Sequence, residues 1–588
     1  MAIHKLDQNL INKIAAGEVI ERPASVVKEL IENSLDANAT KIFVEIREAG
    51  KSYIKVEDDG DGMTEEDAIF CIERHSTSKI KDINDLFKIK TLGFRGEALA
   101  SIAAISKMRI ITKTEDSLEG TQVHILNGKV LDKRTVGCNK GTIIEVQNLF
   151  YNTPARKKYL KDIPTELRHI VDVITRYSLS NPQVYFQLIH NNKLVFNAPS
   201  TNDTFNNIVN IYGRSVAKEM LPVNYSNGEI EVIGFVSKPA LTRVDRSHQT
   251  FFVNGRYVQN IVISRALNDA YGTLLMVNRK PVAVLNIAIN PVKIDVNVHP
   301  TKREIKFSNE KELYNTVFNA VKETLTKNNL TRSAIEEDAK LTPLGTVKAK
   351  MEVKHGYDLV RDEQSILDEM LKSDRPLKEI MEDEEDIMVE GILPKRKDFT
   401  VIGQLNKTYI LIEDDDGLAI IDQHVAEERP NYEDFMRQFR HKDVPTQTLI
   451  NPIVLELDPR NKIILESNLK LIHELGFDVD EFGDGSFILR AVPVIMGKEM
   501  KKEILLDIID EISVLSKTIS LEQLQEKVIT RMACRASIMA GEELTKPQMI
   551  KIVDRLFRSA QPHTCPHGRP TMIRMSLKDL EKKFKRVI

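Results

Sequence analysis

The segment Val26-Val-Lys-Glu-Leu-Ile-Glu-Asn-Ser-Leu-Asp36 spaces its apolar residues three and four apart, which predicts a helix with one buried stripe. Its polar face carries Glu29 and Asn33 one turn apart. An asparagine oxygen can ligate a hard cation, and a neighbouring carboxylate can orient water for attack on a phosphate that the cation holds. The alternative is an amphipathic helix whose polar face is only solvated.

Two glycine-containing groups follow this helix. Alternating apolar residues predict strands over 42–46 and 54–56, and the second strand runs into Asp58-Asp-Gly60-Asp-Gly62. Glycines there allow a ligand to approach closely, and a fixed Asp58 can accept a hydrogen bond from an amine such as that of adenine. Further on, 92–98 precedes an Ala-rich helical run, where exposed backbone N–H groups favour an anion. A helix carboxylate, then Asp-x-Gly-x-Gly, then a glycine loop that opens a helix follow one another within about the first hundred residues. This order indicates a ligand-binding site and not only structural turns.

Longer runs resemble the MutL family of DNA mismatch-repair proteins; they lie at 17–29, 32–37, 74–79, 93–101 and 150–156. The resemblance implies a GHKL-type (Bergerat) ATPase sandwich that binds ATP and Mg²⁺. By carry-over, Glu29 would be the general base, Asn33 the magnesium ligand and Asp58 the adenine contact. The remaining cofactor-binding residues implied by the family are Gly60, Gly62, Thr77, Ser78, Lys79, Gly93, Phe94, Arg95, Gly96, Glu97 and Ala98.

Length and composition limit which broad classes of protein this chain can belong to. The 588 residues suffice for three or four domains, and the net charge of −3 provides no global basic field for nucleic acid. Four scattered cysteines make no disulfide framework, and we see neither a signal peptide nor a membrane-spanning run. We therefore expect a cytoplasmic, nucleoid-associated protein without a membrane partner, and DNA contacts limited to local patches.

The pattern changes near residue 206. Strands are expected at 230–236, 249–253 and 282–289, with the hairpin turn Asn254-Gly255 after the second, and a helix at 309–326. The family implies a second subdomain of the ribosomal protein S5 type, in which Lys302 would reach the γ-phosphate; the alternative is that Lys302 merely tips a loop. The acidic stretch 331–397 lacks apolar periodicity and is expected to be a flexible linker.

A second group of polar residues lies in the last third of the chain. Strands are predicted over 399–412 and 418–421, the latter ending at Asp422. A helix starting after Gln423 would place His424 and Glu428 one turn apart, and Cys565-Pro-His567 offers a thiolate and an imidazole. Brought together, these five side chains would suit one or two metal ions with open positions. The alternative is a satisfied turn at each place.

The same segments resemble the endonuclease motifs of the MutL proteins that nick DNA. By carry-over, Asp422, His424, Glu428, Cys565 and His567 would bind Mn²⁺ or Zn²⁺, with Asp422 and Glu428 catalytic and with Glu433 and Cys534 in support. Three departures from the motifs stand out. Val425 replaces alanine, Met539 replaces a basic residue, and Pro430 lies inside the predicted helix, where it removes a hydrogen bond and puts the position of Glu433 in question.

Two shorter groups of residues are candidates for binding DNA and a sliding clamp. Arg156, Lys157 and Arg256 are candidate DNA contacts, and the alternative for the first two is a solvated helix start. Residues Gln447, Leu449, Ile450 and Pro452 resemble the sliding-clamp-binding peptide of nicking MutL proteins; the alternative is an ordinary strand.

Together these features predict an α/β (α+β) chain of four regions. They are a GHKL ATPase domain (1–205), an S5-like transducer (206–330), a flexible linker (331–397) and an α/β dimerisation and endonuclease domain (398–588) with a regulatory insertion near 457–530. The expected function is that of a homodimeric ATP-gated clamp that couples mismatch recognition by MutS to nicking of DNA, with N-terminal dimerisation on ATP binding. The alternatives are a non-nucleolytic matchmaker with a structural metal, or a GHKL chaperone or topoisomerase subunit.

Overall fold

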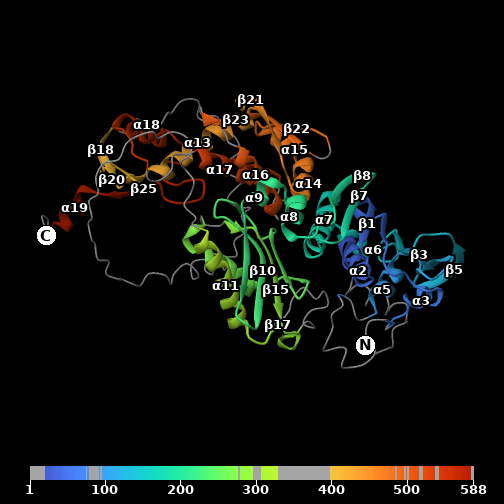
Figure 1. Ribbon diagram of the computed structural model, residues 1–588. Helices are drawn as coiled ribbons and strands as arrows, with labels where there is room; N and C mark the ends of the chain where they lie inside the picture. Colours follow the sequence, from blue (N-terminus) through green and yellow to red (C-terminus); the bar gives the residue numbers. More distant parts are fainter. Residues whose placement is uncertain are drawn as a thin grey trace, which may run out of the picture. The chain divides into compact units, whose positions relative to one another are not determined.

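The chain forms two compact units in the computed structural model (Figure 1). The first comprises Met1–Leu330, Glu427–Met539 and Thr564–Arg569, and the second comprises Thr331–Ala426, Ala540–His563 and Pro570–Ile588. The structure describes residues 20–74, 76–77, 92, 96–275, 279–295, 306–328, 398–483, 486–495, 498–499, 502–515, 521–536 and 542–584.

An eight-stranded sheet begins the first unit, in the order β5-β4-β3-β6-β2-β1-β7-β8. All neighbouring strands are antiparallel except β1 and β7, which are parallel. The strands are β1 (Lys41–Arg47), β2 (Tyr53–Asp58), β3 (Lys107–Lys113), β4 (Gly120–Leu126), β5 (Lys129–Val136), β6 (Gly141–Gln147), β7 (Tyr185–His190) and β8 (Lys193–Ala198). One apolar core joins this sheet to the helices α2 (Pro23–Asp36), α5 (Ala98–Ile105) and α7 (Ile163–Ser180).

Helix α2 confirms the pattern predicted for residues 26–36. Pro23 occupies its first turn, where a missing N–H costs nothing, and Val26, Val27, Leu30 and Ile31 are at most 1% exposed. The strands predicted after it are also confirmed: β1 and β2 pair antiparallel with Val44 opposite Val56. The sheet therefore holds the end of β2 beside the polar residues of α2.

A five-stranded sheet follows in the same unit, in the order β13-β12-β15-β10-β9. Its strands are β9 (Met220–Ser226), β10 (Ile230–Ser237), β12 (Gln249–Val253), β13 (Arg256–Val258) and β15 (Ala283–Ile289), and its apolar core includes α10 (Ile261–Tyr271) and α11 (Glu310–Lys327). The hairpin turn is confirmed, because Asn254 and Gly255 have φ of 50° and 77°, both positive as a type I′ turn requires. Short pairs are β11 (Thr242–Arg243) with β14 (Lys280–Pro281), and β16 (Ile294–Asp295) with β17 (Lys306–Phe307).

Residues from the last third of the chain complete the first unit. The strands β21 (Thr446–Leu455), β22 (Asp478–Glu481), β23 (Phe487–Ile495) and β24 (Lys498–Glu499) form a small sheet. It shares a core with helices α13 (Gln423–Arg440), α14 (Pro459–Ser467), α15 (Leu469–Glu474), α16 (Lys502–Leu515) and α17 (Leu521–Ala536).

Ion pairs connect these residues to the earlier part of the first unit. His248 Nε2 lies 3.3 Å from Asp458 Oδ2, and Arg279 Nη1 lies 2.8 Å from Asp507 Oδ1. All four side chains are at most 13% exposed. The pairing of Arg279 with Asp507 avoids the cost of an isolated buried charge, and His248 gives the buried Asp458 a hydrogen-bond partner.

The second unit contains an antiparallel sheet in the order β18-β19-β20-β25. The strands are β18 (Phe399–Leu405), β19 (Tyr409–Asp414), β20 (Gly417–Asp422) and β25 (Met572–Met575), accompanied by α18 (Lys546–Phe557) and α19 (Leu577–Lys583). The single strand predicted over 399–412 is therefore wrong. Asn406 and Lys407 have φ of 51° and 52°, so they turn the chain into a hairpin.

Helix α13 answers the question that Pro430 raised about the position of Glu433. The helix is continuous from Gln423 to Arg440 with Pro430 inside it. Its neighbours Ala426 and Phe435 are at most 1% exposed, so tertiary packing stabilises the helix against the loss of one backbone hydrogen bond. Glu433 therefore keeps its helical position.

The remaining helices are short. They are α3 (Glu65–Phe70), α6 (Pro154–Tyr159), α8 (Thr204–Tyr212), α9 (Arg214–Lys218) and the 3₁₀ turns η1 (Glu48–Gly50), η2 (Gly272–Leu274) and η3 (Pro291–Lys293). Within the described ranges, no helix combines the length and the apolar character needed to cross a membrane.

We expect Gly234→Ala to destabilise the five-stranded sheet. Gly234 has φ of 148°, and a Cβ there would lie 2.1 Å from the backbone oxygen of Val284, so the central strands would have to separate. The expected cost is about 3 kcal/mol, or a melting temperature lower by roughly 6–12 °C in a thermal scan. Gly403→Ala is the control, because its Cβ would meet nothing within 4 Å; equal melting of the two variants would contradict the expectation.

Candidate functional site

Asp58 is fixed at the end of β2 by three donors. Its Oδ2 accepts a hydrogen bond from Ser34 Oγ at 2.7 Å, and its Oδ1 accepts from the backbone N–H groups of Gly60 at 3.0 Å and Thr142 at 3.3 Å. Burial raises the pKa of Asp58, and these three hydrogen bonds oppose that rise. The carboxyl group therefore has one orientation, as recognition of a ligand amine requires.

Three glycines line this region where a side chain would not fit. A Cβ on Gly60 would lie 2.6 Å from Ala37 O, and one on Gly62 would lie 2.1 Å from Lys113 O. Gly96 has φ of 61°, and its Cβ would lie 2.4 Å from Ser76 O. The backbone segments can therefore pack this closely against one another only because these residues are glycine.

Glu29 and Asn33 lie one turn apart on α2, as predicted, with Asn33 half-buried. Glu29 Oε1 lies 2.8 Å from Lys28 Nζ, and the Glu29 side chain is 19% exposed. A carboxylate that is oriented by an ion pair and remains partly exposed suits a group that orients water.

The structure describes only part of the predicted phosphate-binding segment. Thr77, Gly96, Glu97 and Ala98 are described, and α5 begins at Ala98. Ser78, Lys79, Gly93, Phe94, Arg95 and Lys302 lie outside the described residues. At its near end the segment is tied to α2, because Asp36 Oδ1 accepts a hydrogen bond from Leu92 N at 2.8 Å.

Sequence reasoning missed two residues of this region, Ser34 and Thr142. Both hold Asp58, and Thr142 Oγ1 lies 3.0 Å from Thr112 Oγ1 on the neighbouring strand β3. Ser34 gave a usable signal, because it falls on the buried side of α2 while being polar, and such a residue needs a partner.

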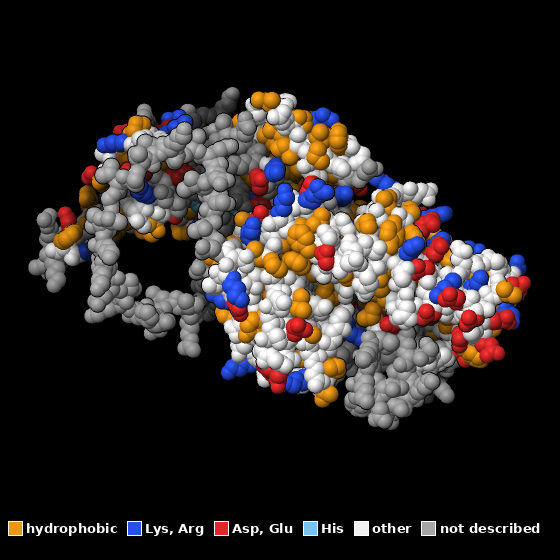
Figure 2. Space-filling view, viewed as in Figure 1, with side chains coloured by type: hydrophobic (Ala, Val, Ile, Leu, Met, Phe, Trp, Pro, Cys, Tyr) orange, Lys and Arg blue, Asp and Glu red, His pale blue; other side chains and the backbone are white. Residues whose placement is uncertain are grey.

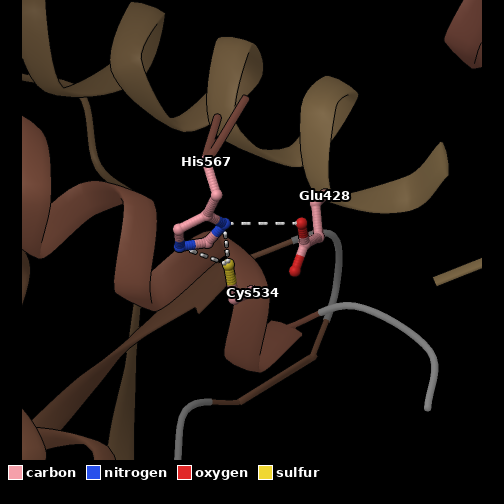
Figure 3. A group of neighbouring side chains, drawn as sticks. All are labelled: Glu428, Cys534 and His567. Carbon is pink, nitrogen blue, oxygen red and sulfur yellow. Dashed lines mark hydrogen bonds and ion pairs between the residues drawn. The ribbon is translucent and has the colours of Figure 1, made fainter. Parts of the chain in front are cut away.

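A second group of side chains converges within the first unit from three separate segments. Figure 3 shows Glu428 on α13, Cys534 on α17 and His567 on the loop before β25 pointing toward one another. One ligand atom from each lies within 4.8 Å of the others. His567 Nδ1 is 3.6 Å from Glu428 Oε2 and 3.7 Å from Cys534 Sγ.

These separations fit a metal ion. Ligand bonds of about 2.0–2.3 Å in tetrahedral geometry place neighbouring donor atoms about 3.4–3.8 Å apart. The measured 3.6 and 3.7 Å lie in that range, and a carboxylate, a thiol and an imidazole form an ordinary donor set for Zn²⁺. The group contains Glu428 and His567, which were predicted as ligands, and Cys534, which was expected only in support; Asp422, His424 and Cys565 are not members of it, and the ligand roles stay predictions.

Cys565 belongs to the same loop but lies slightly farther away. Its Sγ is 4.0 Å from His567 Nδ1 and accepts a hydrogen bond from His567 N at 3.3 Å. Burial, and next to it Glu428, raises the pKa of the Cys534 thiol, and burial likewise raises the pKa of Cys565. Metal binding would have to displace these thiol protons.

Arg429 fixes the loop that carries Cys565 and His567. Its Nε donates to Thr564 O at 2.7 Å and its Nη2 donates to Cys565 O at 3.0 Å. The guanidinium is buried, so both bonds are shielded from water. Arg429 was not predicted as a site residue, because nothing local in the sequence links it to residues 564–565.

Asp422 and His424 belong to the second unit, and their part in the metal site stays a prediction. Asp422 Oδ1 accepts hydrogen bonds from the backbone N–H groups of His424 at 3.0 Å and Val425 at 3.2 Å. The carboxylate therefore caps the start of α13. Met539 lies outside the described residues.

The predicted partner-binding residues have varied surroundings. Arg156 Nη1 donates to Ile20 O at 3.1 Å, whereas Lys157 is exposed on α6, and Arg256 is half-buried at the start of β13. Gln447 pairs with Val492 in β21, but pairing with β23 is interrupted between Thr448 and Ile453. Ile450 in that interruption is 96% exposed.

Comparison with known proteins gives a consistent result along the chain. Three family models match: "Histidine kinase-, DNA gyrase B-, and HSP90-like ATPase" over residues 20–140, "DNA mismatch repair protein, C-terminal domain" over 208–326, and "MutL C terminal dimerisation domain" over 402–544. The first confirms the expected GHKL ATPase fold, and the third confirms a separate C-terminal dimerisation domain.

Full-length relatives agree with these models. The chain is 40% identical to the DNA mismatch repair protein MutL of Thermoanaerobacter sp. (strain X514) and 38% identical to that of Bacillus cereus (strain G9842), covering 100% of both partners in each comparison. Among solved structures, it is similar to the "Aquifex aeolicus MutL ATPase domain complexed with ADP", at 26% identity over 51% of this chain and 98% of that one. The TM-score of 0.37 is too low to add to the fold assignment.

We expect Cys534→Ser to lower the zinc and manganese content of the purified protein. Loss of one of three convergent ligands should weaken metal retention about tenfold or more, as measured by elemental analysis after dialysis. Cys138→Ser is the control, because Cys138 lies in the eight-stranded-sheet region and outside the cluster. Equal metal content in both variants would remove Cys534 from the site.

Proposed function

The chain belongs to the MutL family of DNA mismatch-repair proteins, and from this premise we propose that it couples ATP binding and slow hydrolysis to metal-dependent nicking of DNA. The observation that carries the nuclease half of this proposal is the convergence of Glu428, Cys534 and His567 from three segments far apart in sequence. A carboxylate, a thiol and an imidazole that converge in this way are candidate ligands of a catalytic metal.

The ATPase half follows from the α2 and β2 residues. Asp58 is positioned to accept from the adenine amine, Asn33 to ligate Mg²⁺, and Glu29 to orient the attacking water. The glycine segment at 93–96 and Lys302 would contact the phosphates. No arginine finger is indicated by motif, so we expect slow turnover.

The nuclease half assigns roles to the second cluster. Glu428, Cys534 and His567 would hold a Zn²⁺ or Mn²⁺ ion, with Cys565 beside them and Asp422 and His424 as further ligands. The bound metal would supply Lewis-acid activation of water and of the phosphodiester. The protein itself orients these donors, with Arg429 fixing the loop. Asp422 and Glu428 are the proposed catalytic carboxylates.

DNA would contact local basic positions. On the face shown in Figure 2, acidic side chains gather near α3, whose first turn carries Glu65, Glu66 and Asp67, and phosphates would be repelled there. Lys157 and Arg256 are the candidates with exposed or half-exposed side chains. Arg156 has a backbone partner, so its contribution would be to position α6.

Dimerisation would use the sheet of the second unit. Leu411, Ile420 and Ile573 lie opposite one another on β19, β20 and β25, and therefore on one face. Ile573 is 64% exposed, whereas the opposite face carries fully buried Ile410 and Ile421. An exposed apolar row beside a buried one suits a second copy of the chain. ATP binding would add N-terminal dimerisation.

Further partners complete the proposal. MutS would signal the mismatch, and a sliding clamp would bind the segment from Gln447 to Pro452, where exposed Ile450 is available in the interruption of β21. The second candidate function is a non-nucleolytic matchmaker that keeps the ATPase and uses the metal structurally. The thiol in the cluster favours this candidate, because closed structural zinc sites are rich in cysteine.

We expect two carboxylate substitutions to separate the activities. Glu29→Gln should lower ATP hydrolysis about 10²–10⁴-fold, because the general base is lost, and should leave Mn²⁺-dependent nicking of supercoiled plasmid intact. Glu428→Gln should do the reverse. Glu522→Gln, an exposed carboxylate on the same helix as Cys534, is the control for both assays.

The assay requires a metal series, with and without ATP. Absence of metal-dependent nicking by the unmodified protein would support the matchmaker, whereas nicking that survives both Glu428→Gln and Asp422→Asn would reject these two residues as the catalytic carboxylates. Asparagine at 422 keeps the oxygen that caps α13, so this substitution removes the charge with little effect on the helix start.

We expect Ile573→Asp to dissociate the C-terminal dimer, because a carboxylate would be buried without a partner in the apolar row. Light scattering should then give one chain mass of 66.9 kDa in place of twice that value. Leu118→Asp is the control, since Leu118 is 96% exposed in the first unit. An unchanged mass for Ile573→Asp would place the dimer interface elsewhere.

A further inference from the structure

Lys28, next to the proposed base, is a buried cation with two carboxylate partners. Its Nζ lies 2.8 Å from Glu29 Oε1 and 3.0 Å from Glu32 Oε2, and its side chain is 12% exposed. Burial opposes the charge, but the two carboxylates outweigh it and raise the pKa of Lys28. The ammonium therefore remains charged and bridges the two acidic residues.

Glu32 is itself held from another helix. The Tyr177 hydroxyl on α7 donates to Glu32 Oε1, and both residues are buried. Burial, and next to it the charge of Glu32, raises the pKa of Tyr177 well above its usual value, so the hydroxyl keeps its proton and stays a donor. Lys28 is thus held by the buried Glu32, which is 5% exposed, and also contacts Glu29, which is 19% exposed.

This arrangement needs an explanation, because neighbouring residues on a helix point about 100° apart. The Lys28 ammonium nevertheless lies within 3.0 Å of an oxygen of each carboxylate. Without the ammonium, two partly buried carboxylates would repel one another.

We propose that Lys28 is a positioning residue for ATP hydrolysis: it fixes the carboxylate of Glu29, and Glu32 with Tyr177 fixes Lys28. The inference rests on the proposed function of Glu29 as the base. It assigns to this chain a relay from Tyr177 to Glu32 to Lys28 to Glu29, in which only the last member would touch the water.

The same relay connects the base to the second sheet of the unit. On α7, Ser180 Oγ donates to Gly255 O at 3.0 Å, and the guanidinium of Arg176 lies 4.6 Å from the ring centroid of Tyr257. Both contacts join the helix that carries Tyr177 to the hairpin of β12 and β13. A displacement of this hairpin would therefore reach Glu29 through three side chains.

The test measures kcat and KM for ATP, nucleotide affinity and melting temperature in Lys28→Met, Lys28→Arg and Tyr177→Phe. We expect Lys28→Met to lower kcat at least tenfold with KM and nucleotide affinity within twofold of the unmodified protein, since a misplaced base loses rate more than binding. Lys28→Arg should recover most of kcat, and Tyr177→Phe should lower it about threefold. The control is Arg109→Met, which removes an ion pair between Arg109 on β3 and Glu145 on β6 of the eight-stranded sheet. It should change neither kcat nor KM.

Two results would overturn the proposal. One is an unchanged kcat in Lys28→Met; the other is a fall in kcat matched by an equal fall in nucleotide affinity, which indicates a structural role only. If Lys28→Met does not fold, an arginine variant with unmodified kcat and a Tyr177→Phe variant with reduced kcat still support the relay, and unmodified kcat in Tyr177→Phe rejects it. Glu29→Gln separates the two hypotheses: full hydrolysis by that variant rejects Glu29 as the base, whatever Lys28 does.

Discussion

The burial of one stripe of α2 fixes the rotation of this helix, and the nucleotide site depends on that rotation. Val26, Val27, Leu30 and Ile31 are at most 1% exposed, and each contributes about 1.5–3 kcal/mol by leaving water. Turning the helix by one residue would expose part of this stripe and bury Glu29. The apolar residues therefore determine where the carboxylate of Glu29, the proposed base, points.

The two sites obtain their geometry in different ways. Asp58, Ser34 and Glu29 come from one helix and the adjacent strand, so a short part of the chain aligns them. Glu428, Cys534 and His567 come from segments separated by more than 100 and by 33 residues, and only the packed core of the first unit brings them together. The first site should therefore tolerate changes in distant loops better than the second, which depends on long-range packing.

Local patterns account for what the sequence could predict. Helix α2, the strands β1 and β2 and the turn at Asn254-Gly255 follow from periodicity and turn chemistry within a few residues. The hairpin at Asn406-Lys407 was missed, because lysine is unusual at positive φ and tertiary context imposes it.

Long-range contacts account for what the sequence did not predict. The continuity of α13 through Pro430 depends on the burial of Ala426 and Phe435 against other segments. The place of Cys534 beside Glu428 and His567 likewise depends on where α17 packs, and the support of Asp58 by Thr142 depends on sheet order. Propensity and spacing carry no information about such neighbours.

The hydrogen bonds from Arg429 to the carbonyl groups of Thr564 and Cys565 hold the loop in place without a cation. The loop also closes on itself, since Cys565 N donates to Arg569 O at 2.8 Å and Gly568 N donates to Cys565 O at 2.9 Å. Its conformational entropy is therefore lost when the chain folds, and capture of an ion does not have to order the backbone again. Slow amide hydrogen exchange in this loop should persist in chelator-treated protein.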